Sequence, residues 1–185
     1  MLLSAERSAL VIVDVQERLM PAVVEPGRVL RNIDVLLKAA GELKVPVLVS
    51  EQYPKGLGPT VAAVRNALPP DSVASNPVVE KITFSSAGSP AFMDRLVGLG
   101  RKQIVLLGAE THVCVLQTAL AVAAADFDVF LVADACSSRT KENIELAIAR
   151  MRANGIEIVS TEMVVFEWME RAGTPSFKII SQLIK

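Results

Sequence analysis

The sequence predicts an α/β fold: a single three-layer, Rossmann-like domain in which six parallel strands, in the order 3-2-1-4-5-6, carry helices on both faces. Short apolar runs alternate with amphipathic stretches along the 185 residues, as in successive β-α-β units. The runs are continuously apolar rather than alternating, which is typical of strands buried on both faces. With 51% hydrophobic and 21% charged residues, we expect one globular domain over residues 1–185.

Six segments have the length and composition of strands. The first run is wholly apolar and ends at Asp14, and the others are rich in Val, Ile and Leu. The expected strands are Ala9–Val13, Val47–Val49, Pro77–Glu80, Gln103–Leu107, Asp128–Val132 and Ile156–Val159.

The helices between these strands are indicated by their periodicity and by their end signals. Pro26 begins the first, Ser89 and Pro90 suit a cap and first position, and Asn154-Gly155 ends the last long one. The expected helices cover 27–43, 61–68, 89–99, 113–125 and 140–153, with two further C-terminal pieces. Residues 51–59, rich in proline and glycine, are expected to form a loop.

Three reactive side chains follow strand ends in this topology. Asp14 closes strand 1, Lys81 closes strand 3, and Cys114 lies just after strand 4. In doubly wound sheets ligands bind beyond the carboxyl ends of the strands, where the strand order reverses, here between strands 1 and 4. The topology alone therefore predicts that Asp14, Lys81 and Cys114 share one rim of the sheet.

Cys114 is the expected nucleophile. It falls at the first turn of the helix after strand 4, where free backbone N–H groups and the helix dipole favour a thiolate and can bind an oxyanion. An ammonium such as Lys81 at ~4 Å would add roughly 4 kcal/mol at an effective dielectric of about 20. Asp14 would accept the thiol proton. The alternative is that Cys114 is a small core residue, as we expect for Cys136.

Composition and motifs exclude several other classes. A net charge of -1 offers no basis for binding nucleic acid or an anionic membrane, and no apolar run is long enough to span a bilayer. We see no signal peptide, and two distant cysteines suit a reducing, cytoplasmic location. One histidine and no carboxylate cluster predict no metal, and no dinucleotide, Walker A or Gly-x-Ser-x-Gly motif occurs, so no cofactor is expected.

These residues together resemble the isochorismatase-like cysteine hydrolases, and most closely the isochorismatase domain-containing proteins. The resemblance is carried by Val11-Ile-Val-Asp14-Val-Gln16, Lys81-Ile-Thr-Phe-Ser85, Gly108-Ala-Glu-Thr-His-Val-Cys114-Val and Asp134-Ala-Cys-Ser-Ser138, the last expected as a turn after strand 5. Glu51-Gln-Tyr53 replaces the Asp-x-His metal motif of nicotinamidases, so that assignment is not favoured.

The resemblance implies a mechanism and a set of site residues. Asp14 removes the thiol proton, Lys81 stabilises the anion, and Cys114 attacks a carbonyl to form a thioester. It also implies a cis peptide between Ala109 and Glu110, which turns the amides of Glu110 and Cys114 toward the oxyanion. The candidate substrate-binding residues are Gln16, Tyr53, Phe84 and His112.

Three functional hypotheses remain open at this stage. The first is a metal-independent hydrolase of amidase type, acting on carbon–nitrogen bonds of a small amide or related acyl compound. The second is a catalytically silent member of the same fold that acts as an oligomer or interaction module. The third is a nucleotide-binding Rossmann domain, which lacks its glycine fingerprint here. Alanine-rich helix surfaces and a mean hydropathy of +0.43 also favour a homo-oligomer.

Overall fold

In the computed structural model the sheet is built around its most apolar strand. The structure describes residues 1–69 and 77–184. All six residues of β1 (Ser8–Val13) are buried, and β1 pairs in parallel with β2 (Val47–Gln52) and β4 (Gln103–Ala109). Each of these three strands is buried along its whole length, so helices must cover both faces of the sheet.

The other strands extend the sheet on either side. β3 (Val78–Lys81) pairs with β2, β5 (Asp128–Ser137) pairs with β4, and β6 (Glu157–Val159) pairs with β5. All pairings are parallel, and the order is β3-β2-β1-β4-β5-β6. The strand order expected from the sequence is therefore confirmed.

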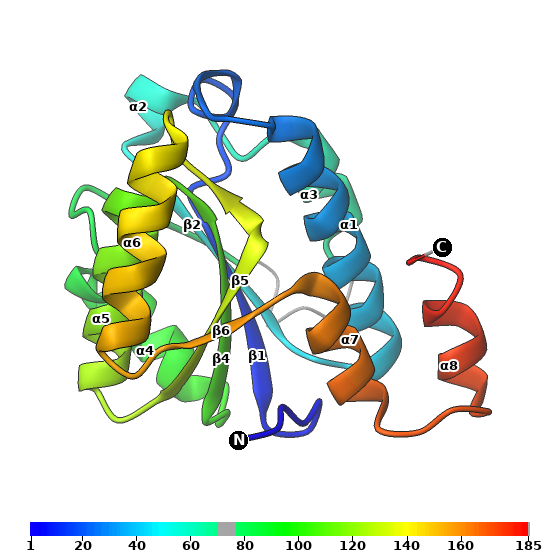
Figure 1. Cartoon of the computed structure of the whole chain (residues 1–185). Coiled ribbons are helices and arrows are strands. Elements are labelled where there is room, and N and C mark those ends of the chain that lie inside the picture. Colours follow the sequence, from blue (N-terminus) through cyan, green and yellow to red (C-terminus); the bar gives the residue numbers. More distant parts are fainter. Residues whose placement is uncertain (70–76, 185) are drawn as a thin grey trace.

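The helices form a layer on each face of the sheet (Figure 1). One layer contains α1 (Pro26–Leu43), α3 (Ala62–Ala67), α7 (Thr161–Met169) and α8 (Pro175–Ile180). The other contains α4 (Pro90–Gly98), α5 (Leu116–Ala124) and α6 (Lys141–Ala153). Four shorter helical segments also lie within the described residues: η1 (Met20–Ala22), α2 (Pro54–Leu57), η2 (Ser86–Gly88) and η3 (Thr111–Val115).

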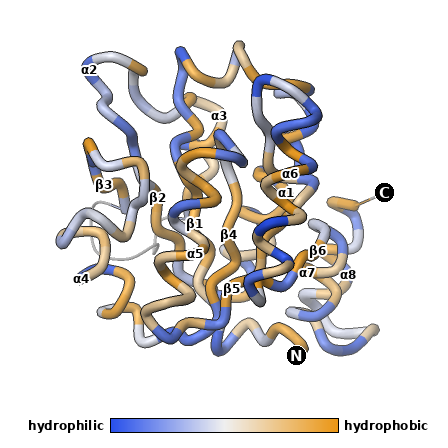
Figure 2. Tube along the Cα trace, turned by 60° about the vertical axis from the view of Figure 1, so that its left-hand side comes forward, coloured by the Kyte–Doolittle hydropathy of each residue, from blue (hydrophilic) through white to orange (hydrophobic). Residues whose placement is uncertain are grey.

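The helices pack as their residue patterns predict. In α1 the buried positions Val29, Ile33, Leu36 and Leu37 repeat at intervals of three and four residues, so one stripe faces the sheet. Thr140 caps α6, because its side chain accepts a hydrogen bond from the backbone of Asn143. In Figure 2 the hydrophobic residues run along the central strands, where the core lies.

The structure corrects the predicted element ends at the carboxyl side of the sheet. β2 continues to Gln52 instead of Val49, and β5 continues to Ser137 instead of Val132, so the expected turn at Asp134–Ser138 is mostly strand. The helix expected from Val113 begins with η3 at Thr111. The loop expected at 51–59 contains α2. Within the described ranges, no helix has the length and apolar character that crossing a bilayer requires.

Candidate active site

The strand register brings the ends of β1, β2, β3 and β4 together. Val13 pairs with Ser50 on one side and with Gly108 on the other, while Gln52 pairs with Lys81. Asp14 therefore emerges from β1 beside the polar end of β2 and opposite the loop that leads from β4 to Cys114.

Gly108 permits this close approach of β1 and β4. Its φ is 128°, and a Cβ atom built there would lie 2.0 Å from the carbonyl oxygen of Val13. No side chain fits in that space, so only glycine allows the two strands to meet immediately before the site.

Asp14 is fully buried and holds its carboxylate between two donors. Its backbone lies in the left-handed region with φ 53°, and its N–H donates to the Ser50 carbonyl at 3.1 Å. Oδ1 accepts a hydrogen bond from Ser50 Oγ, and Oδ2 accepts one from Lys81 Nζ, each at 2.7 Å. The carboxylate is thus ion-paired, hydrogen-bonded and fixed in rotation.

Lys81 is equally buried and has no free donor. Besides Asp14, its Nζ lies 2.8 Å from Gln52 Oε1, 3.0 Å from the Phe84 carbonyl and 3.2 Å from the Thr83 carbonyl. An ammonium group has three protons, and four acceptors surround it here. The protons of Lys81 are therefore taken up by oxygen acceptors, and its positive charge lowers the pKa of the Cys114 thiol.

Cys114 lies in η3, 5% exposed, beside the Asp14–Lys81 pair. Burial raises the pKa of its thiol to about 12, the negative charge of Asp14 adds to the increase, and the positive charge of Lys81 opposes it. The expected lowering of this pKa is wrong, because desolvation and Asp14 outweigh Lys81. The resting group is therefore a neutral thiol that lies beside the Asp14 carboxylate.

The thiol opens into a small hollow of about 260 Å³. Its lining residues are Leu19, Gln52, Leu57, Phe84, Glu110, Val113, Cys114 and Arg139. The walls are mostly apolar, and the charged groups are an ion pair in which Arg139 Nε donates to Glu110 Oε1 at 2.8 Å. Within the described part of the chain, neither terminal nitrogen of Arg139 donates a hydrogen bond.

The peptide bond between Ala109 and Glu110 is cis, at the position that the family resemblance implies. It leads directly into η3, where the Glu110 carbonyl accepts hydrogen bonds from the N–H groups of Val113 and Val115. Glu110 thus directly precedes the short helix that holds Cys114.

Of the four predicted substrate-binding residues, only Phe84 lines the hollow that contains Cys114. Gln16 is fully buried, and its amide bonds the backbone of Gln52 and Gly58. His112 Nδ1 lies 2.9 Å from Ser138 Oγ. Tyr53 lines a neighbouring hollow on the β3 side. Gln16, Tyr53 and His112 therefore lie near the site but do not line the hollow that contains Cys114.

Sequence reasoning missed Arg139, Gln52 and Ser50 as residues of this site. Arg139 comes two residues after the end of β5, so extending the strand-end rule to β5 would have identified it. Ser50 and Gln52 belong to a strand that the pattern ended at Val49. Among the described residues, no three His, Cys, Asp or Glu side chains gather as a metal centre requires.

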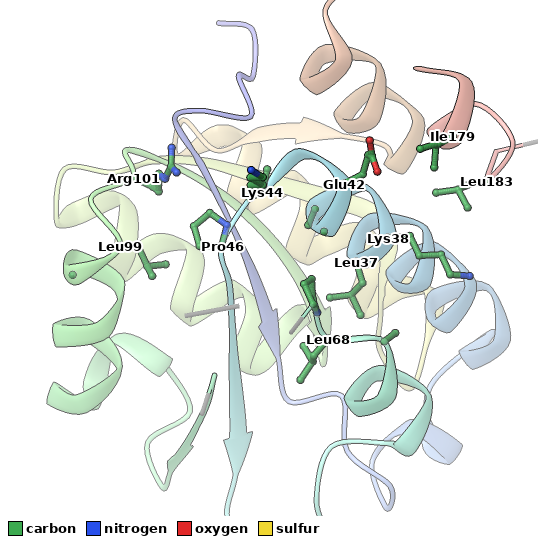
Figure 3. A pocket seen from close by; sticks show the side chains of 16 residues that line it. Leu37, Lys38, Glu42, Lys44, Pro46, Leu68, Leu99, Arg101, Ile179 and Leu183 are labelled. Atoms are coloured by element: carbon green, nitrogen blue, oxygen red, sulfur yellow. The ribbon is translucent and has the colours of Figure 1, made fainter. Parts of the chain in front are cut away.

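A larger hollow of about 880 Å³ lies at the other side of the sheet from Cys114, near the amino ends of β2 and β4 (Figure 3). Pro46 and Arg101, which precede β2 and β4, line it together with Leu37, Leu99 and Ile179. None of its described lining residues has a thiol, hydroxyl or imidazole group, so it offers no nucleophile of these kinds. The candidate reactive side chains Asp14, Lys81 and Cys114 lie instead at the carboxyl ends of the strands.

Comparison with known proteins identifies the family. The isochorismatase domain model matches residues 8–163. Isochorismatase domain-containing protein 2A of Mus musculus is 37% identical over 97% of this chain and 84% of its own. The structure of MAR1 ribonuclease from Caenorhabditis elegans aligns with a TM-score of 0.91 and 30% identity, covering 100% of this chain and 92% of that one. The Escherichia coli YcaC gene product, described as an octameric hydrolase of unknown specificity, shares the fold with a TM-score of 0.90 and 23% identity, over 99% and 90% of the chains. This chain belongs to the isochorismatase family.

Proposed function

We propose that this chain is a cysteine-dependent hydrolase that cleaves a small amide or related acyl compound, using Asp14, Lys81 and Cys114. The observation that carries the proposal is the buried Asp14–Lys81 ion pair beside a thiol that opens into a hollow. A buried ion pair is weak support for stability, because desolvation offsets its attraction. A nucleophile with a perturbed pKa beside charged groups in a cavity, as Cys114 is here, is characteristic of active sites.

In the first half of the proposed reaction the thiol proton moves to Asp14 as sulfur attacks the carbonyl carbon. A C–S bond forms, and the carbonyl electrons move to oxygen, which the amides of Glu110 and Cys114 stabilise. The tetrahedral intermediate then collapses, and the C–N bond breaks. Asp14 returns the proton to the departing nitrogen, which leaves a thioester on Cys114.

In the second half, water hydrolyses the thioester. Asp14 accepts a proton from the attacking water, the C–S bond breaks, and the proton passes to sulfur as the acid leaves. Lys81 remains an ammonium group throughout, because its four oxygen acceptors hold its protons. Its proposed role is to hold the Asp14 carboxylate in place and to balance the negative charge, whether that charge is on Asp14 or on the Cys114 sulfur.

The hollow favours a small acyl group with an apolar part. A cavity of about 260 Å³ lies below the usual range for drug-sized ligands, which is about 300–1,000 Å³. Leu19, Leu57, Phe84 and Val113 form its apolar wall. Arg139 adds one guanidinium group at the rim, where an anionic substituent can bind.

A covalent adduct is the direct test of the proposal. We would incubate the protein with a panel of small amides, thioesters and acyl esters, and measure its intact mass. The expected result is an acyl adduct on native protein and on Cys136→Ala, but not on Cys114→Ala. An adduct or turnover that persists in Cys114→Ala contradicts the proposal.

Two alternative functions make different predictions. A catalytically silent member would show no turnover that depends on Cys114. A ribonuclease, the activity named for the Caenorhabditis elegans relative, would cleave RNA. The small hollow and the net charge of -1 do not favour RNA as a ligand. RNA cleavage by native protein that is lost in Cys114→Ala would replace the amide proposal.

We also propose that the chain forms a homo-oligomer through the surface near β3. Tyr53, Ile82 and Phe84 are 53%, 80% and 56% exposed, and Tyr53 and Ile82 line a hollow of about 500 Å³. Lys55 and Glu80 line the same hollow, so two copies related by a twofold axis could pair these opposite charges. Ile82→Asp should reduce the mass measured by light scattering, and an unchanged mass contradicts this interface.

A cytoplasmic location is proposed on the basis of the thiols. Cys114 and Cys136 are both free and buried, and the proposed chemistry requires Cys114 to be reduced. Fractionation of the source cells tests this location, and recovery of the protein outside the cell contradicts it.

A further inference from the structure

A chain of buried hydroxyl groups leads to the Asp14 carboxylate. Ser50 Oγ lies 2.7 Å from Asp14 Oδ1, and Ser86 Oγ lies 3.1 Å from Ser50 Oγ. The N–H of Ser86 in turn donates to Thr118 Oγ1 of α5 at 2.9 Å. All four side chains have no exposed surface. The chain thus connects β1, β2, η2 and the helix that follows Cys114.

Chemistry fixes the direction of these hydrogen bonds. An ionised carboxylate can only accept, so the single proton of Ser50 points to Asp14. Ser50 Oγ must then accept from Ser86, whose proton points along the same direction. Both O–H dipoles are aligned toward the negative charge, and aligned donors strengthen one another in a dry interior.

The segment from Thr83 to Ser86 supports both oxygens of the carboxylate. The carbonyls of Thr83 and Phe84 hold Lys81, which donates to Oδ2. Ser86 holds Ser50, which donates to Oδ1. A carboxylate held at both oxygens cannot rotate freely, and rotation would change the lone pair that faces Cys114.

We infer that Ser50, supported by Ser86, is a positioning residue that holds Asp14 ionised and oriented to receive the Cys114 proton. The inference rests on the proposed function, because it concerns the same proton transfer. Hydrogen bonds to a carboxylate favour its ionised form. Loss of the Ser50 hydroxyl therefore makes the carboxylate easier to protonate, and the protonated form cannot act as a base.

The test is the pH dependence of iodoacetamide labelling, measured by intact mass in a Cys136→Ala background where Cys114 is the only thiol. We call the pH at which labelling falls to half of its neutral-pH rate on acidification the acidic midpoint. Ser50→Ala should lower the labelling rate near neutral pH about tenfold and raise this acidic midpoint by about one pH unit. Ser86→Ala should give a smaller shift in the same direction. Ser50→Thr keeps a hydroxyl and should restore the midpoint.

Ser8→Ala is the matched control. Ser8 is also a fully buried serine in a strand, but its hydroxyl bonds Ser4 and Trp168 at the other end of β1. Ser8→Ala should therefore leave the acidic midpoint of labelling unchanged. An unchanged midpoint in Ser50→Ala, or an equal shift in Ser8→Ala, overturns the inference. If Ser50→Ala does not fold, Ser86→Ala decides by the same criterion.

The two proposals can fail separately. If Cys114 of the parent protein is labelled readily, and the acidic midpoint is unchanged in Ser50→Ala and Ser86→Ala, only the positioning role is contradicted. A midpoint that shifts as expected in a protein that forms no acyl adduct contradicts the hydrolase proposal and leaves the positioning of Asp14 supported.

Discussion

Replacing Asp14 with asparagine should make the Cys114 thiol more acidic while it strongly slows the proposed acyl turnover. Burial and the Asp14 charge are the two largest causes that raise the pKa of Cys114 to about 12. A unit charge at ~4 Å contributes about 4 kcal/mol at an effective dielectric of about 20, which corresponds to about 3 pKa units. The pKa of Cys114 in Asp14→Asn should therefore fall from about 12 toward about 9.

The same substitution removes the proposed general base, so acyl turnover should fall by about two to four orders of magnitude. It also leaves the buried Lys81 ammonium without its counter-ion, which should lower the free energy of unfolding by about 3–5 kcal/mol. The alkaline midpoint of iodoacetamide labelling in a Cys136→Ala background measures the thiol pKa, and Asp34→Asn, on the surface, is the control. A pKa that stays near 12 in Asp14→Asn would refute the electrostatic reasoning.

Three further substitutions test other parts of the structure. Gly108→Ala should lower the free energy of unfolding by about 4 kcal/mol or more, measured by urea denaturation, because the new Cβ would meet the Val13 carbonyl. Gly98→Ala is the control, since its Cβ would meet no atom of the described residues outside its own helix within 4 Å. Equal stabilities of the two variants would contradict the close approach of β1 and β4. Burial raises the pKa of Cys136 to about 12 from 9.0, so folded protein keeps a proton that unfolded chain loses above pH 9. Stability should therefore fall between pH 9 and 12, and Cys136→Ala should reduce that fall by about 1.4 kcal/mol per pH unit; an unchanged slope would refute this assignment. Arg139→Met should lower labelling of Cys114 by iodoacetate about fivefold relative to neutral iodoacetamide, since a partly exposed charge contact contributes about 1 kcal/mol; an unchanged ratio would exclude Arg139 from anion binding.

The strand order and the shared rim were predictable because they depend on few features of the sequence. A continuously apolar run such as that before Asp14 must be buried on both faces, and alternation with helices forces parallel pairing. Once the order is set, the carboxyl ends of strands 1, 3 and 4 must lie on one side. The proximity of Asp14 to Lys81, 2.7 Å apart across 67 residues of chain, follows from that topology.

The strand ends were harder to predict because polar residues there resemble loop. Ser50, Glu51 and Gln52 are polar, yet all three are buried in β2. Their side chains are satisfied by distant groups: Ser50 by Asp14, Glu51 by Thr60, and Gln52 by Lys81. The local sequence around β2 does not reveal these partners, because they lie outside the strand. The same limit applies to Gln16, whose amide looked available for a substrate but bonds backbone groups instead.

The acidity of Cys114 depends on the balance between burial and charge, which no motif encodes. A thiol pKa of about 12 and a role as nucleophile are compatible in the proposed mechanism. That pKa describes the creation of a second negative charge beside Asp14 in a dry site. Catalysis requires only the transfer of one proton from sulfur to Asp14, which moves an existing negative charge from oxygen to sulfur and leaves the net charge of the trio at zero. Lys81, saturated by its four acceptors, serves as a fixed counter-ion for either position of the charge. The reactivity of Cys114 toward acyl groups should therefore depend on the transfer of one proton between Cys114 and Asp14 rather than on the formation of a free thiolate.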